Sequence, residues 1–407
     1  GIMAAALTKL WKGIGQSRFV AAFALFWLLN ALLAFGRVGF AAPADFPVLS
    51  WTGWTIKQFL AESKRPEIVF LGSSLVLVPL DGVDADFLNR KVDGSQHHHS
   101  AYFENRWREL TGMKSSTYTF ALPGEMPSDA YLIVKNLLTG KKQPDVIVYG
   151  VGPRDFLDNL LPSPSATDPF RYLSRFGSVE PVAARVMPEW QERLNYEMGR
   201  AFSLYGNRED LSAGGAKLAG RYCDGVLANV KQISADERHV LMPDYHPCEV
   251  CAGQAFFRPT TSKDREAFAD NLGEYKKRYA KLKWNTYLTQ MEFFADTLET
   301  ARARGIKSVV VAMPITDLNR SLLSDKSWLA YRNGVLAMAK RKGAATVDLS
   351  ESPLFSRADF MDTVHLHSGG GKRWLDLVAA AMCQDKQVVS ALANQSKKLA
   401  GKGGQPQ

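Results

Sequence analysis

The sequence has few cysteines and lacks the short motifs of several enzyme classes. Only four cysteines and seven histidines occur in 407 residues. No His-Glu-x-x-His pair is present, and the glycines at 369–371 are followed by Lys-Arg rather than by the Lys-Ser or Lys-Thr of a phosphate-binding loop. These absences argue against a zinc hydrolase and a P-loop enzyme, so we expect no metal site and no cofactor.

The basic residues do not form a nucleic-acid-binding pattern. The formal net charge is +9, but lysines and arginines are scattered and are not interleaved with aromatic residues in one block. An anionic polymer or a membrane surface therefore suits this charge better than nucleic acid does. With 46% hydrophobic residues, the chain can fill the core of one large α/β domain.

One long apolar run lies near the start of the chain. Seventeen residues, Phe19 to Phe35, carry no charge, and Lys9, Lys12 and Arg18 precede them without any acidic residue. This length is at the short limit for a transmembrane helix, and the upstream cations would keep the N-terminus cytoplasmic. The sequence predicts a cytoplasmic N-terminus and single-pass anchor over residues 1–42, in the inner (cytoplasmic) membrane, and a periplasmic domain over residues 43–391.

A cleaved signal peptide is the alternative interpretation of this run. Gly39-Phe40-Ala41 offers small residues near a possible cleavage point. The uncleaved anchor is favoured because Arg37 lies between the run and that point, and because the run is longer than a usual signal-peptide core. Either interpretation exports the rest of the chain.

Three of the four cysteines lie close together in the sequence. Outside the cytoplasm Cys223 could form a disulfide with Cys248 or Cys251. His246 beside the Cys-x-x-Cys pair resembles half of a zinc site, but no second half is present. A disulfide is therefore the favoured use.

Short β-branched runs bounded by glycine or proline predict buried strands. Four such runs are Glu67–Leu71, Asp145–Pro153, Lys307–Pro314 and Ala345–Leu349. Helical patterns lie between them, the clearest over Asp264–Arg304, whose apolar stripe is typical of core packing. This alternation predicts an α/β fold of three layers, a parallel sheet flanked by helices on both faces.

Some segments fit this alternation poorly. Residues 158–262 are Pro-rich in part and hold three cysteines, so we expect a helical insertion or cap there. Residues 392–407 have the composition of a disordered tail. The run His97-His98-His99 is interpreted as a solvated loop rather than a metal site.

Small hydroxyl residues interrupt the first strand, and a histidine with a nearby acid lies near the far end of the chain. Ser73 and Ser74 follow the strand where open α/β sheets bind their ligands. A serine becomes nucleophilic when a histidine takes its proton and a carboxylate orients that histidine. Asp362 and His365 are spaced so that carboxylate and imidazole can meet within one turn.

These two segments together resemble the SGNH hydrolase superfamily. Its first block is Gly-Asp-Ser-Leu, here Gly-Ser-Ser-Leu at 72–75, and its last is Asp-x-x-His-Leu, here at 362–366. The resemblance implies Ser74 as nucleophile, His365 as base and Asp362 as the orienting acid. The Gly-Ser-Ser form is most similar to the membrane-anchored branch of proteins for alginate O-acetylation and lipoteichoic acid D-alanylation.

The middle blocks of the superfamily match less well. Gly124 stands where a second-block glycine would lend its N–H to an oxyanion hole. The third block is normally Gly-x-Asn-Asp, but the chain reads Gly-Pro-Arg-Asp at 152–155, so Arg154 replaces the asparagine. Arg154 is expected either to stabilise an oxyanion or bind an anionic substrate, or to form a structural pair with Asp155.

The resemblance implies a membrane-anchored O-acyltransferase, with acetyl as the expected acyl group. It would act on an envelope or secreted polysaccharide through an acyl-serine, together with a membrane-bound O-acyltransferase. Two alternatives stay open: an esterase that hydrolyses acyl esters, and a non-catalytic scaffold of a polysaccharide-modification complex.

Overall fold

The computed structural model describes residues 17–36, 51–177, 179–208, 211 and 256–393. By its internal contacts the chain divides into two units, one of residues 49–187 and 248–407 and the other of residues 1–48 and 188–247. The expected cysteine cluster at 223–251 and residues 394–407 of the expected tail lie outside the described residues. The predicted start of that tail at residue 392 was wrong, because Leu392 is buried. Cys383 has a free thiol.

The larger unit is built on five parallel strands, of which the sequence predicted four; the strand over Thr117–Ala121 was not predicted. They are β1 (Ile68–Gly72), β3 (Thr117–Ala121), β4 (Val146–Val151), β6 (Lys307–Ala312) and β7 (Ala345–Asp348). Their order in the sheet is β3-β1-β4-β6-β7. The chain therefore leaves β1 toward β3 and returns on the other side of β1 to β4. The topological switch point, where open α/β sheets bind ligands, lies between β1 and β4.

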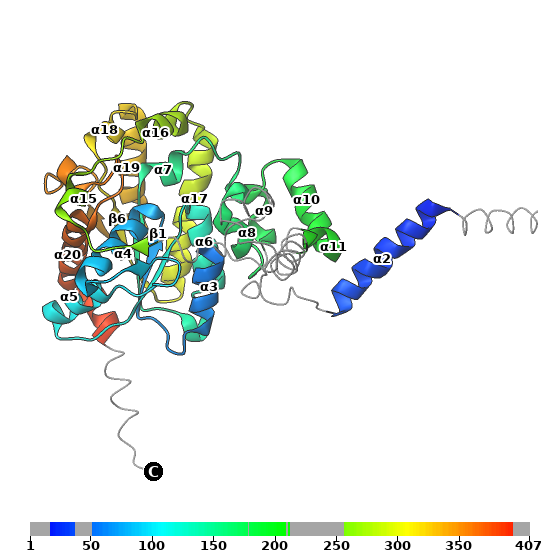
Figure 1. The fold of residues 1–407 in the computed structure, drawn as a ribbon, viewed down its shortest axis with the longest axis horizontal. Helices are drawn as coiled ribbons and strands as arrows, with labels where there is room; N and C mark the ends of the chain where they lie inside the picture. The colour runs from blue at the N-terminus through cyan, green and yellow to red at the C-terminus, as the bar shows by residue number, and fades with distance from the viewer. Residues whose placement is uncertain (1–16, 37–50, 178, 209–210, 212–255, 394–407) are drawn as a thin grey trace, which may run out of the picture. The chain divides into compact units, whose positions relative to one another are not determined.

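Helices cover both faces of this sheet (Figure 1). One group consists of α4 (Ser74–Leu88), α5 (Ala101–Thr111) and α20 (Ser368–Gln384), which pack on one another. The other includes α6 (Pro127–Asn136), α17 (Trp284–Ala303) and α19 (Asp325–Arg341). The predicted α/β class with a parallel sheet between helices is thus confirmed.

Shorter elements complete the unit. They are α3 (Trp51–Ala61), α7 (Pro153–Leu157), α8 (Asp168–Leu173), α9 (Ala183–Val186), α15 (Ser262–Glu266), α16 (Leu272–Tyr279), α18 (Asp317–Arg320) and a two-stranded pair of β2 (Val92–Asp93) with β5 (Phe256–Phe257). Helices α8 and α9 belong to the unit of the sheet, although they fall within the expected insertion.

The expectation of one helical pattern over Asp264–Arg304 was wrong in one respect, because three helices occupy it. Helix α15 ends at Glu266, α16 begins at Leu272 and α17 begins at Trp284. At the first break, Asp270 accepts the main-chain N–H of Leu272 through its side chain, which competes with helix formation. The expected core residues Met291, Phe294 and Leu298 are buried as predicted.

The interpretation of the three consecutive histidines as a solvated loop was wrong for the middle one. His98 is 3% exposed and stacks on Tyr118, and burial lowers its pKa to about 3. His97 pairs with the buried Asp84 at 2.7 Å. No cluster of three metal-ligating side chains occurs among the residues that the structure describes.

The smaller unit contains α2 (Arg18–Gly36), α10 (Trp190–Ala201) and α11 (Ser203–Gly206). Helix α2 is long and apolar enough to cross a membrane. Residues 18–35 have a mean hydropathy of 1.9, and 6% of these residues are buried. Its apolar residues lie on all sides of the helix.

Candidate active site

Ser74 is placed by a tight turn between β1 and α4. Gly72 has φ +144°, Ser73 is extended, and Ser74 is the first residue of the helix. A side chain at Gly72 would bring its Cβ within 2.5 Å of the carbonyl oxygen of Gly150 and 2.6 Å of Val76. The glycine thus lets the end of β1 pass against β4 and leaves the hydroxyl of Ser74 at the sheet's carboxyl edge.

We predict a large stability cost for Gly72→Ala and a small one for Gly124→Ala. Both glycines have positive φ, but the nearest atom to a Cβ at Gly124 would be 3.7 Å away. Gly72→Ala should lower the free energy of unfolding by about 3 kcal/mol or more through its main-chain clash, and Gly124→Ala by about 1 kcal/mol through φ alone. Urea unfolding measures both. Equal costs for the two variants would contradict the role given to the Gly150 carbonyl.

Asp362 and His365 come together in the turn before α20. The carboxylate Oδ1 of Asp362 accepts the main-chain N–H groups of Val364 at 2.8 Å and His365 at 2.7 Å. Its Oδ2 lies 2.6 Å from Nδ1 of His365. Burial alone would raise the pKa of Asp362, but these bonds and the imidazole hold it below its ordinary value. An ionised Asp362 makes Nδ1 of His365 the donor.

The other ring nitrogen of His365 meets Ser74. Nε2 lies 2.9 Å from Oγ of Ser74, although the two residues are 291 positions apart in the sequence. Because Nδ1 donates to Asp362, Nε2 of the neutral ring is free to accept the hydroxyl proton. The structure therefore brings Ser74, His365 and Asp362 into one continuous hydrogen-bonded chain.

The neighbouring serine and histidine, Ser73 and His367, are not part of this hydrogen-bonded chain. Ser73 is 2% exposed and stands at the N-cap position of α4. His367 caps α20: its Nδ1 accepts the N–H of Gly369 at 2.9 Å, and its Nε2 lies 2.5 Å from the carbonyl oxygen of Ala358. Of these serines and histidines, Ser74 and His365 are therefore the pair with the geometry for proton transfer.

A buried polar network holds the turn of Asp362 and His365 in place. Thr363 is fully buried, and its carbonyl accepts the hydroxyl of Thr316 at 2.7 Å. Its hydroxyl accepts from Asn319 at 3.2 Å, and its N–H donates to the side chain of Asn271 at 3.2 Å. Thr363, two positions before His365, is thus fixed by α18 with its N-cap Thr316 and by Asn271 just before α16.

Gly124 lies in a turn that faces Ser74 across a shared pocket. The N–H of Glu125 donates to the carbonyl of Leu122 at 3.0 Å, Pro123 precedes Gly124, and Gly124 has φ +78°. These are features of a type II turn, in which proline and glycine take the two central positions. The predicted turn is therefore present beside Ser74.

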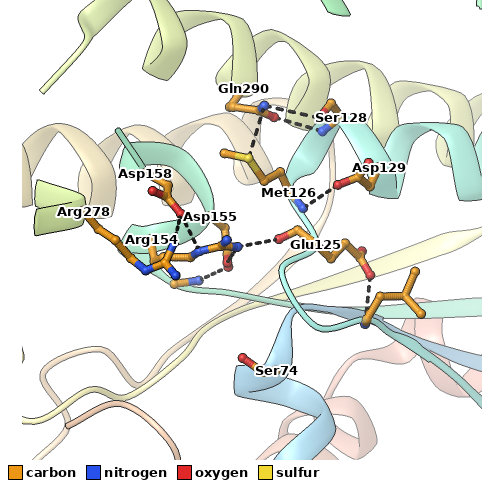
Figure 2. Close-up of polar contacts among 12 residues, drawn as sticks. Ser74, Glu125, Met126, Ser128, Asp129, Arg154, Asp155, Asp158, Arg278 and Gln290 are labelled. Carbon is orange, nitrogen blue, oxygen red and sulfur yellow. Dashed lines mark hydrogen bonds and ion pairs between the residues drawn. The ribbon is translucent and has the colours of Figure 1, made fainter. Parts of the chain in front are cut away.

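Arg154 lies next to this turn (Figure 2). Its Nε pairs with Oδ2 of the buried Asp158 at 3.0 Å, and its Nη1 lies 3.5 Å from the main-chain oxygen of Glu125. Its Nη2 is the atom that a Cβ on Gly124 would meet. The expected ion pair between Arg154 and Asp155 is long, with 4.0 Å between Nη1 and Oδ1. Arg154 is thus held mainly by Asp158, which Arg278 of α16 also contacts, and it reaches the Gly124 turn.

The carboxyl groups of Glu125, Asp129 and Asp155 are buried near Arg154. Burial raises the pKa of Asp155 to about 6 and of Asp129 to about 7. Burial, then the charges of Asp129 and Asp155, raises the pKa of Glu125 well above its ordinary value. Asp155 accepts the N–H of Gly152 at 2.8 Å and Glu125 that of Leu122 at 3.2 Å, so these groups secure the two turns around the site.

One pocket unites these parts. It has a volume of about 160 Å³ and is lined by Ser74, Gly124, Arg154 and His365 together with residues of α16. Sequence reasoning missed the contribution of α16, which comprises Glu274, Tyr275, Arg278 and Tyr279, with Asn271 just before it. Tyr275 and Tyr279 were interpreted as core residues, and they are indeed buried, with 8% and 6% of their surface exposed. No local sequence motif indicates that they also line the pocket.

No protein-family model and no curated protein matches this chain. A hydroxyl, an imidazole and a carboxylate are aligned for nucleophilic attack on a carbonyl carbon, beside a glycine turn and a guanidinium able to donate hydrogen bonds to a developing negative charge.

Proposed function

We propose that this protein is a membrane-anchored O-acyltransferase of the SGNH type, which transfers a small acyl group through an ester on Ser74. The single observation that carries the proposal is the chain Ser74–His365–Asp362, with distances of 2.9 Å and 2.6 Å. A scaffold without catalytic function has no need of such an alignment. The resemblance of the first and last sequence blocks to the superfamily supports the same assignment.

The reaction divides into two halves. Ser74 attacks the carbonyl carbon of the donor ester while His365 takes its proton, and His365 then protonates the leaving group. The acyl group is left on Ser74. In the second half, His365 takes the proton of an acceptor hydroxyl, which attacks the acyl-serine; His365 then returns that proton to the Ser74 oxygen as its ester bond breaks. Gly124 and Arg154 are proposed to stabilise the negative oxygen in both halves.

The size of the pocket favours a small acyl group such as acetyl. Its volume of about 160 Å³ is below the roughly 300–1,000 Å³ of pockets for drug-sized ligands. Polar side chains of Arg154, Arg278, Glu274 and Asn271 contribute to its wall, which does not suit a long hydrocarbon chain. We infer a hydroxyl-rich acceptor, in line with the polysaccharide that the resemblance implies.

The proposed location of the acyl donor rests on α2. With Lys9, Lys12 and Arg18 on the cytoplasmic side, α2 would place the catalytic unit on the periplasmic side of the inner membrane. A small acyl group can reach that side through a membrane-bound O-acyltransferase, the partner that we propose. The protein would then pass the group to the polysaccharide.

Intact-mass measurement tests the acyl-serine directly. The full chain in detergent is incubated with p-nitrophenyl acetate, alone and with acceptor oligosaccharides. We expect one acetyl adduct on the parent and on Ser73→Ala, and none on Ser74→Ala. Acetylated oligosaccharide exceeding free acetate supports transfer, whereas free acetate as the main product in every mixture would make the protein an esterase. An equal adduct on Ser74→Ala would remove the proposed nucleophile.

A further inference from the structure

Helix α10 of the smaller unit exposes a row of large apolar side chains. Trp190, Leu194 and Met198 are 61%, 52% and 39% exposed, and no residue of the helix is buried. They follow one another at intervals of four, so they lie along one side of the helix. An exposed apolar row of this size is costly in water and indicates a surface that something covers.

The opposite side of α10 packs on α11. Gly199 and Gly206 bring the two helices into close contact, since a Cβ on Gly206 would lie 2.2 Å from the carbonyl oxygen of Gly199. The hydroxyl of Tyr205 donates to the side chain of Asn195 at 2.5 Å. The apolar row is therefore turned away from the helix that pairs with α10.

The same pair of helices is attached to α2. The ring of Phe202 lies 5.6 Å from that of Phe26 and 5.4 Å from that of Trp27. The N–H of Leu204 donates to the side chain of Asn30 at 3.1 Å. The polar side chain of Asn30, within the apolar α2, therefore has a hydrogen-bond partner in α11. Phe26 is eight residues from Arg18, about 12 Å along the helix axis. Helix α11 thus contacts the middle of the segment suited to cross a membrane.

We infer that α10 lies in the lipid of the outer leaflet, with Trp190, Leu194 and Met198 against the acyl chains and headgroups. The attachment of α11 to the middle of α2 puts the pair at the depth of the bilayer when α2 spans it. Helices can lie there because their main-chain groups bond internally. Tryptophan at one end of the row suits the membrane interface. The inference rests on the membrane location of α2 and not on the chemistry of Ser74.

Lipid fits the row better than a second protein does. Helix contacts inside membranes are enriched in small residues, whereas large apolar residues suit lipid. In α10 the small Gly199 faces α11, and the large side chains face outward. Two glutamates and two arginines balance each other in this helix, so the attraction is to hydrocarbon rather than to anionic headgroups.

Photocrosslinking in membranes tests this inference. Benzoylphenylalanine replaces Leu194 on the apolar row, or Glu192 as the matched position, which lies about 200° away around the helix. Exposed Leu28 on α2 serves as the reference for lipid contact. The full chain is irradiated in native membranes, its thermal unfolding is compared with that of the parent, and the adducts are identified by mass.

The expected result is phospholipid adducts at positions 28 and 194, several-fold more than at 192. Protein adducts at 194 in place of lipid would overturn the inference in favour of a partner subunit. Lipid adducts at 28 without any at 194, or equal labelling at 192 and 194, would also overturn it. Absence of lipid adducts at 28 would remove its basis, the membrane location of α2. None of these outcomes bears on whether Ser74 carries an acyl group.

Discussion

Replacing Ser74 by alanine is expected to lower the turnover of an activated acetyl ester by about 10⁴–10⁶-fold, and His365→Ala should cost about as much. The reason is that neither group acts alone: the hydroxyl 2.9 Å from Nε2 is a weak nucleophile until the imidazole takes its proton. Stopped-flow or steady-state kinetics of nitrophenol release from p-nitrophenyl acetate by the full chain measures both losses. The melting temperatures of both variants should stay close to that of the parent, because the two side chains line the pocket and are not part of the core.

The double variant provides the sharper test. If Ser74 and His365 work as one unit, the double variant Ser74→Ala/His365→Ala should turn over the ester no more slowly than either single variant. Ser73→Ala is the matched control, since Ser73 is adjacent and does not bond to His365. Losses that multiply in the double variant would show that the two residues act independently and would contradict the proposed proton transfer.

The strands of the sheet could be predicted where their residues are plainly β-branched and apolar. Strand β3 was missed because its sequence, Thr-Tyr-Thr-Phe-Ala, looks half polar. Thr117 and Thr119 are nevertheless buried. The hydroxyl of Thr117 is satisfied inside the protein, where it accepts the N–H of Ser100 at 2.7 Å. Partners such as Ser100 come from other parts of the chain and cannot be recognised before the fold is known.

The residues of the proposed triad could be predicted because they belong to short local motifs. Asp362 and His365 are near neighbours in the sequence, and the glycine and serines after β1 form a short local motif. Helix α16 has no such motif. Arg278 lines the pocket and shares Asp158 with Arg154, more than one hundred positions earlier in the chain. A contact of this kind follows from the tertiary structure and not from local spacing.

Arg154→Met is expected to lower kcat by about 10²–10³-fold while changing KM little, because its guanidinium is proposed to act on charge that develops in the transition state. The guanidinium lies beside Gly124, and Gly124 belongs to the turn that faces Ser74. Arg154→Asn would put an amide donor at the position where the superfamily pattern has asparagine, so it should recover part of the lost rate. Steady-state kinetics with an activated acetyl ester measures kcat and KM for each variant.

Arg278→Met separates this role from a structural one. Arg154 and Arg278 both pair with Oδ2 of the buried Asp158, so removing either one weakens the same ion pair. If Arg154 served only to neutralise Asp158, the two methionine variants would lose similar stability and similar, small amounts of kcat. Catalysis by the guanidinium instead requires a much larger loss of kcat for Arg154→Met at comparable melting temperatures. The shared carboxylate thus makes each arginine the control for the other.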